Sequence, residues 1–108
     1  MLRVYQQYLA WLVRLRPVLA SIERRDIDLA RQLRRAAASV ALNLSEGQGN
    51  EGGTRRQRYL SALGSARESL SCLEVAAALG YVAPPRELVA ELGRMVGTLV
   101  VLAVGRRR

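Results

Sequence analysis

Apolar residues recur every three or four positions along four long stretches of the chain, and this periodicity constrains the fold more than any other feature. The clearest seam lies near the C-terminus and consists of Leu88, Leu92, Met95, Leu99 and Leu102. Such spacing places the apolar side chains on one face of an α-helix. No stretch shows the two-residue alternation of a half-buried strand. The sequence therefore predicts an all-α protein.

Proline and glycine divide the chain into its helices. We predict helices over residues 2–22, 27–46, 54–80 and 85–104, with a flexible glycine-rich loop over 47–53. Pro17 lies inside the first helix and is expected to kink it. A chain of 108 residues is large enough for one core and too small for two. We therefore predict one domain over residues 1–108, an antiparallel up-down four-helix bundle with a basic tail at 106–108.

Composition excludes several kinds of site. The chain has no histidine and one cysteine, so a zinc site, a histidine base and a cysteine–histidine pair are all excluded. We expect no metal and no cofactor, and we expect Cys72 to be a small core residue in a reducing, cytoplasmic environment. The N-terminal stretch is too polar for a signal peptide, and no apolar run is long enough to span a membrane.

A row of hydrogen-bonding side chains follows one side of the predicted second helix. Its members lie three or four residues apart and are Arg35, Ser39, Asn43 and Glu46. An antiparallel hairpin about the glycine loop brings this row level with the third helix, where Arg35 meets Glu68 and Glu46 meets Arg56. We predict that the row and Glu68 form a structural polar network that fixes the relative height of the two helices.

An active site is the alternative interpretation of the row, because Glu46 and Glu68 are acids close to Ser39 and Tyr59. Neither a histidine base nor a metal set accompanies them, and the glycine loop has no phosphate-binding lysine. We therefore expect no catalytic residues and a non-enzymatic protein.

Some apolar side chains do not fit the core of one bundle. Leu42 projects away from the core stripe of its helix, and the last helix is apolar almost all round between Val96 and Val104. A small monomer rarely exposes so much contiguous apolar surface. We predict a homo-oligomer with Leu42, Val96, Val100 and Val104 at the interface. A broad core stripe is the alternative.

The formal net charge of +8 favours an anionic partner, RNA or DNA above all. Two arginine clusters are candidate nucleic-acid contacts, at the start of the third helix and in the tail: Arg55, Arg56 and Arg58, then Arg106, Arg107 and Arg108. A helix N-terminus attracts anions, and guanidinium groups bind phosphate. The alternative is a protein-interaction scaffold whose arginines are only solvated.

Two stretches resemble a known family. "QLRRAAASVALNLSEGQG" and "ALGSARESLSCLEVAAALGYV" are similar to the four-helix bundle proteins called 23S rRNA intervening-sequence proteins. The matching residues are Gln32, Arg34, Arg35, Ala36, Ser39, Asn43, Glu46, Gly47, Gly64, Ser65 and Glu68. The first helix departs from the family pattern at Pro17 and at "SIERRDID".

The resemblance implies an up-down four-helix bundle that assembles into a ring-like homopentamer. It also implies kinship with the accessory variability proteins of diversity-generating retroelements, which are basic pentameric bundles that bind a reverse transcriptase and nucleic acid. We therefore expect a non-enzymatic, basic homo-oligomer that binds RNA or DNA and assists a reverse transcriptase or another nucleic-acid enzyme.

Overall fold

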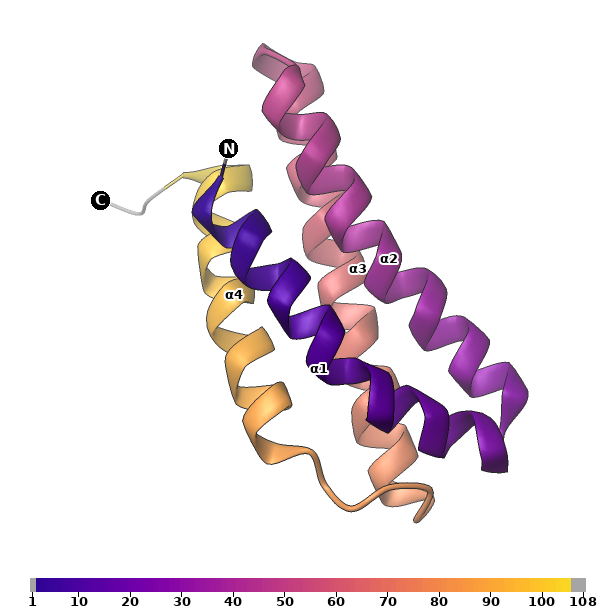
Figure 1. Cartoon of the computed structure of the whole chain (residues 1–108). Coiled ribbons are helices and arrows are strands. Elements are labelled where there is room, and N and C mark those ends of the chain that lie inside the picture. The colour runs from indigo at the N-terminus through magenta and orange to yellow at the C-terminus, as the bar shows by residue number, and fades with distance from the viewer. Residues whose placement is uncertain (1, 106–108) are drawn as a thin grey trace.

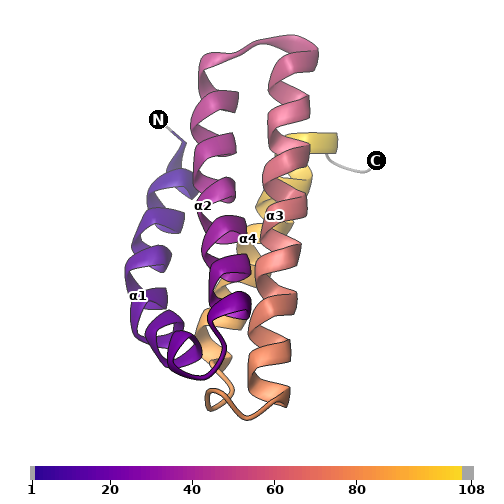
Figure 2. The ribbon, with the colours of Figure 1, turned by 90° about the vertical axis from the view of Figure 1, so that its right-hand side faces the viewer.

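Four helices make up most of the protein in the computed structural model, which describes residues 2–105 (Figure 1). They are α1 (Arg3–Arg25), α2 (Ile27–Gly49), α3 (Gly52–Ala78) and α4 (Arg86–Val104), and no strand occurs within the described part of the chain. Successive helices run in opposite directions (Figures 1 and 2), so the start of α1 and the end of α4 lie at the same end. The predicted all-α, up-down bundle is confirmed.

Asp26 alone separates α1 from α2. Its backbone N–H donates to the Ile22 carbonyl at 2.7 Å, and its side chain accepts a hydrogen bond from the Leu29 N–H at 2.9 Å. The same residue thus ends one helix and caps the next. α1 also continues through Pro17, which removes one N–H donor from the helix. In Figure 2 the last turns of α1 bend toward the start of α2.

The predicted flexible loop over 47–53 is wrong. α2 continues to Gly49 and α3 begins at Gly52, so Asn50 and Glu51 alone connect the two helices. The chain reverses here because Gly52 adopts a φ of 60°, a left-handed conformation that favours glycine.

Gly47 lies inside α2, where its missing side chain leaves room for an aromatic ring of α3. It is buried, and a Cβ placed on it would lie 2.8 Å from Cδ1 of Tyr59 on α3. Any larger residue at this position would overlap the ring. Gly47 therefore serves a contact between helices, whereas the sequence pattern predicted a helix end there.

Two aromatic residues of α1 connect it to both neighbouring helices. Tyr8 and Trp11 are stacked with ring centroids 5.4 Å apart, and each is 1% exposed. The Tyr8 hydroxyl donates to the Ala37 carbonyl on α2 at 2.7 Å, and Trp11 Nε1 donates to the Leu88 carbonyl on α4 at 2.9 Å. Burial raises the pKa of Tyr8 well above its ordinary value.

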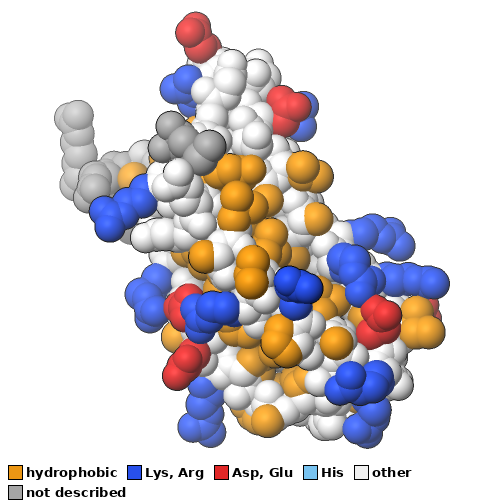
Figure 3. Space-filling model, viewed as in Figure 1, with side chains coloured by type: hydrophobic (Ala, Val, Ile, Leu, Met, Phe, Trp, Pro, Cys, Tyr) orange, Lys and Arg blue, Asp and Glu red, His pale blue; other side chains and the backbone are white. Residues whose placement is uncertain are grey.

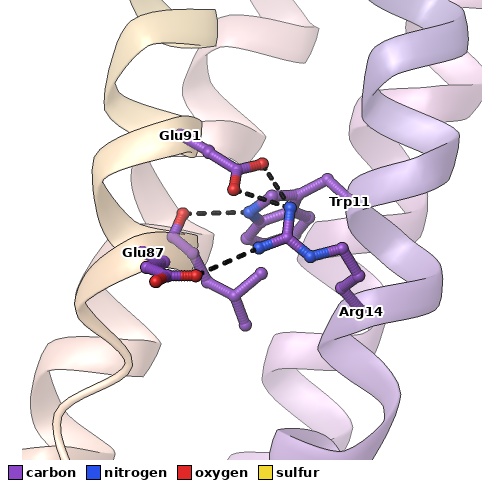
Figure 4. Close-up of polar contacts among 5 residues, drawn as sticks. Trp11, Arg14, Glu87 and Glu91 are labelled. Carbon is purple, nitrogen blue, oxygen red and sulfur yellow. Dashed lines mark hydrogen bonds and ion pairs between the residues drawn. The ribbon is translucent and has the colours of Figure 1, made fainter.

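An ion pair lies beside the Trp11 contact, between α1 and α4 (Figure 4). Nη1 of Arg14 is 2.6 Å from both carboxylate oxygens of Glu91, and Nη2 is 3.8 Å from Glu87. The hydrogen bond with Glu91 raises the pKa of Arg14. Since the side chains of this cluster are partly exposed, their attraction is screened by solvent.

Both α2 and α3 bury several small residues. The buried alanines of these helices are Ala30, Ala36, Ala37, Ala41, Ala62, Ala66 and Ala76. Short side chains allow two helix backbones to approach closely. Cys72 of α3 is a free, buried cysteine, as expected, and burial raises the pKa of its thiol.

Candidate nucleic-acid interface

The α2–α3 hairpin projects beyond the ends of α1 and α4 (Figure 1). The first of the two predicted arginine clusters lies on this projection, near the start of α3. Arg55, Arg56 and Arg58 are all exposed there. We call these three residues and the Asn50–Glu51 connection the hairpin tip.

Arg55 is held by the backbone of the preceding helix. Its Nε donates to the carbonyls of Gly47 at 3.2 Å and Asn50 at 2.6 Å. Carbonyl groups at a helix C-terminus lack partners within the helix and carry partial negative charge, so a cation is favourable there. Arg55 therefore caps α2, a role that the sequence could not indicate while the turn was expected to be a long loop.

Arg56 and Arg58 have no carboxylate partner among the described residues. Nη1 of Arg58 is 3.5 Å from Oδ1 of Asn43 on α2, a long hydrogen bond. The predicted ion pair between Glu46 and Arg56 does not form in this part of the chain. The two guanidinium groups are therefore free to meet an external anion.

Ser39 and Asn43 of the polar row form hydrogen bonds, one of which links α2 to α3 through Ser65. Nδ2 of Asn43 donates to the Ser39 carbonyl at 2.9 Å and to Ser39 Oγ at 3.0 Å. The Ser65 hydroxyl on α3 donates to Ser39 Oγ at 2.9 Å, and buried Ser69 donates to the Ser65 carbonyl at 2.9 Å. Ser69 was missed by sequence reasoning, although its place four residues after Ser65 was a usable signal.

Arg35 and Glu68 lie near each other but do not form the predicted ion pair. Both line a depression of about 440 Å³ between α2 and α3, together with Asp28, Arg31 and Gln32. No ion pair joins Arg35 to Glu68 within residues 2–105. Both side chains are exposed, and solvated ions gain little from direct contact.

The remainder of the row lines a second depression along the same groove. It is bounded by Arg35, Ala38, Ser39, Leu42, Asn43, Ser45, Glu46 and Arg58. Apart from Arg58, which belongs to the hairpin tip, the two depressions hold Arg31 and Arg35 together with the acids Asp28, Glu46 and Glu68. A groove without excess positive charge does not attract a polyanion, so the hairpin tip is the better candidate.

A comparison with protein families adds an independent finding. A family model described as 23S rRNA-intervening sequence protein matches residues 1–98. The chain belongs to this family. The resemblance seen in the polar row is thereby confirmed, whereas the kinship with retroelement accessory proteins stays a prediction. Searches of curated proteins and of solved structures found no match.

The predicted interface residues fall into two groups. Leu42 and Val104 are 67% and 55% exposed. Val96 and Val100 are partly buried and pack against the protein's own core. Val101, which was not predicted, is 39% exposed. The outward apolar surface of α4 thus lies at its end.

The second predicted arginine cluster, Arg106 to Arg108, lies outside the described residues. Within residues 2–105, no group of three or more histidine, cysteine or acidic residues could hold a metal ion. In the same part of the chain, no helix combines the length and the apolar character needed to cross a membrane.

Proposed function

We propose that this protein is a non-enzymatic, basic homo-oligomer that binds RNA or DNA through the hairpin tip. The observation that carries the proposal is the pair of projecting guanidinium groups of Arg56 and Arg58, which have no carboxylate partners within residues 2–105. Membership of a family named for an rRNA sequence and the net charge of +8 support it further.

The contact proposed at the tip is with phosphate and not with bases. Tyr59 is the aromatic residue next to the arginines, and it is only 5% exposed because it packs on Gly47. Without an exposed ring, bases have no stacking surface at this place. Binding is therefore independent of sequence and weakens steeply with added salt.

The test replaces two arginines and leaves the capping residue intact. In Arg56→Gln/Arg58→Gln, binding of RNA and DNA should weaken for every sequence. The slope of log affinity against log salt should also fall by about 0.7 to 0.9 for each phosphate that the protein no longer neutralises. Filter binding over a salt series measures both quantities.

The matched control is Arg3→Gln/Arg86→Gln, which removes the same charge from exposed positions at the starts of α1 and α4. It should bind nearly as well as the parent protein. If both variants lose the same nucleic-acid affinity, the loss is due to net charge and not to the hairpin tip. A folded tip variant with unchanged affinity and slope would refute the proposed site.

Self-association is the second part of the proposal, and exposed Leu42 and Val104 support it. The homopentamer is taken from the family resemblance. Val104→Asp should lower the mass measured by light scattering, whereas Val13→Asp, at a 60% exposed valine of α1, should not. A monomeric parent protein at micromolar concentration would contradict this part alone.

The proposed protein partner is a reverse transcriptase or another nucleic-acid enzyme, and it is supported by the likeness to retroelement accessory proteins. A gene for such an enzyme beside this one, and a complex of the two purified proteins, are the expected results. Neighbouring genes without any nucleic-acid enzyme would count against it.

A further inference from the structure

A surface separate from the hairpin tip lies where the second half of α1 meets the first half of α2. A shallow depression of about 500 Å³ is lined there by Arg16, Leu19, Ala20, Glu23, Arg24, Ile27 and Arg34. We call these seven residues the arginine corner. In Figure 3, arginines and apolar side chains gather on the side where the end of α1 meets the start of α2.

Two arginines of the corner are not engaged by an acid. Glu23, the acidic residue lining the depression, pairs with Arg34 across α1 and α2 at 2.6 Å. Arg24 donates to the Ser21 hydroxyl at 3.1 Å and has no carboxylate partner among the described residues. The same is true of Arg16. The corner therefore has excess positive charge on its α1 side.

Local folding does not explain why an isoleucine occupies position 27. It is the first residue of α2 and 55% exposed, at a position where an acidic residue would suit the helix dipole. Arg24, by contrast, lies in the last turn of α1, where a cation is favourable on local grounds. Arginine is enriched at protein-binding surfaces, and the exposed isoleucine adds an apolar contact beside the unpaired guanidinium groups.

The apolar part of the corner is aliphatic, which favours a protein partner over nucleic acid. Leu19, Ala20 and Ile27 offer no ring on which a base could stack. They do suit an aliphatic side chain of a partner.

We propose that the arginine corner binds an acidic amphipathic helix of a partner protein. A groove between two helices accommodates a third helix through its apolar face. Arg16 and Arg24 are eight residues apart on α1, which corresponds to about 12 Å along the helix. The matching ligand has acidic residues two turns apart with a leucine or isoleucine between them.

The test uses a designed helical peptide with two glutamates eight positions apart and leucines between them. Fluorescence anisotropy at low salt should detect its binding to the full chain. Arg16→Gln/Arg24→Gln should weaken binding about tenfold, and Ile27→Ser should weaken it at every salt concentration. Replacing the two glutamates of the peptide by glutamine should abolish the difference between parent and arginine variant.

Three controls separate this proposal from its alternatives. Arg3→Gln/Arg86→Gln removes the same charge elsewhere, and an equal loss of peptide binding in it would overturn the proposal. A lower assembly mass of Arg16→Gln/Arg24→Gln would instead make the corner an interface between copies. Loss of RNA binding with peptide binding intact would make it a nucleic-acid site. These results do not depend on the hairpin tip.

Discussion

The contact between α1 and α4 and the contact between α2 and α3 are built in opposite ways. α1 and α4 meet through one large ring, Trp11, whose N–H reaches the Leu88 carbonyl, and through the Arg14 ion pairs. α2 and α3, which both bury alanines, meet through the hydroxyls of Ser39 and Ser65 and through the glycine that faces Tyr59. One contact depends on a side chain that fills space and the other on side chains that leave space.

This difference determines which substitutions each contact tolerates. A large core residue is sensitive to truncation, because the cavity left behind collapses only partly. A close contact of small residues is sensitive to enlargement, because the neighbouring atoms have no room to move. The two halves of the bundle should therefore fail under opposite kinds of mutation.

Trp11→Ala should have the largest effect. The ring is 1% exposed, so its loss should lower the free energy of unfolding by about 3–5 kcal/mol. Urea unfolding followed by circular dichroism measures this. Trp11→Phe retains much of the volume and loses the hydrogen bond to Leu88, so it should recover a large part of the stability. A loss below about 1 kcal/mol in Trp11→Ala would show that the ring does not hold α1 on α4.

Gly47→Ala tests the opposite rule between α2 and α3. The added methyl group meets the Tyr59 ring and should cost about 1–3 kcal/mol of the free energy of unfolding. Gly49 is the matched control, since it lies in the same helix with nothing within 4 Å of an added Cβ. Gly49→Ala should be neutral or stabilise by up to about 1 kcal/mol. Equal effects at the two positions would disprove the close contact.

Tyr8→Phe should have the smallest effect, about 1 kcal/mol at neutral pH, because the Ala37 carbonyl lies within α2 and keeps a helical partner. Its main consequence concerns pH. Burial raises the pKa of Tyr8, so the folded state holds the phenol proton more tightly than the unfolded chain. The resulting stability is complete below about pH 10 and is lost as the pH rises above it.

Measurements of unfolding between pH 8 and pH 11 therefore separate the variant from the parent protein. Tyr8→Phe should lose stability less steeply above about pH 10. A residual slope should stay, because burial raises the pKa of the Cys72 thiol and a hydrogen bond with Asp26 raises the pKa of Tyr81. Identical slopes in both proteins would contradict the assigned role of Tyr8.

Apolar periodicity, together with the breaks at proline and glycine, predicted the helices and the bundle, because each helix buries one stripe of its own residues. The predicted loop over 47–53 was wrong for a physical reason. Glycine in a sequence indicates a helix end, yet Gly47 is needed where Tyr59, distant in sequence, packs against it. Such a requirement cannot be seen in a local pattern.

The polar row was predicted in part, for a similar reason. Hairpin register brought Arg35 and Glu68 to one depression, as expected, but register does not determine whether exposed side chains pair. The hydrogen bond between Ser39 and Ser65 forms between the same two helices and was not predicted. The capping role of Arg55 was out of reach, because it depends on a turn of only two residues.

The hydrogen bonds of Arg55 have a kinetic consequence. Its guanidinium group belongs to the first turns of α3, while the carbonyls that it binds belong to Gly47 and Asn50 at the end of α2. Neither helix end can fray without releasing the other. The backbone amides on both sides of the turn should therefore exchange with deuterium at a common rate, as one cooperative opening. In Arg55→Gln the two sets of amides should exchange independently, and those at the end of α2 should exchange faster.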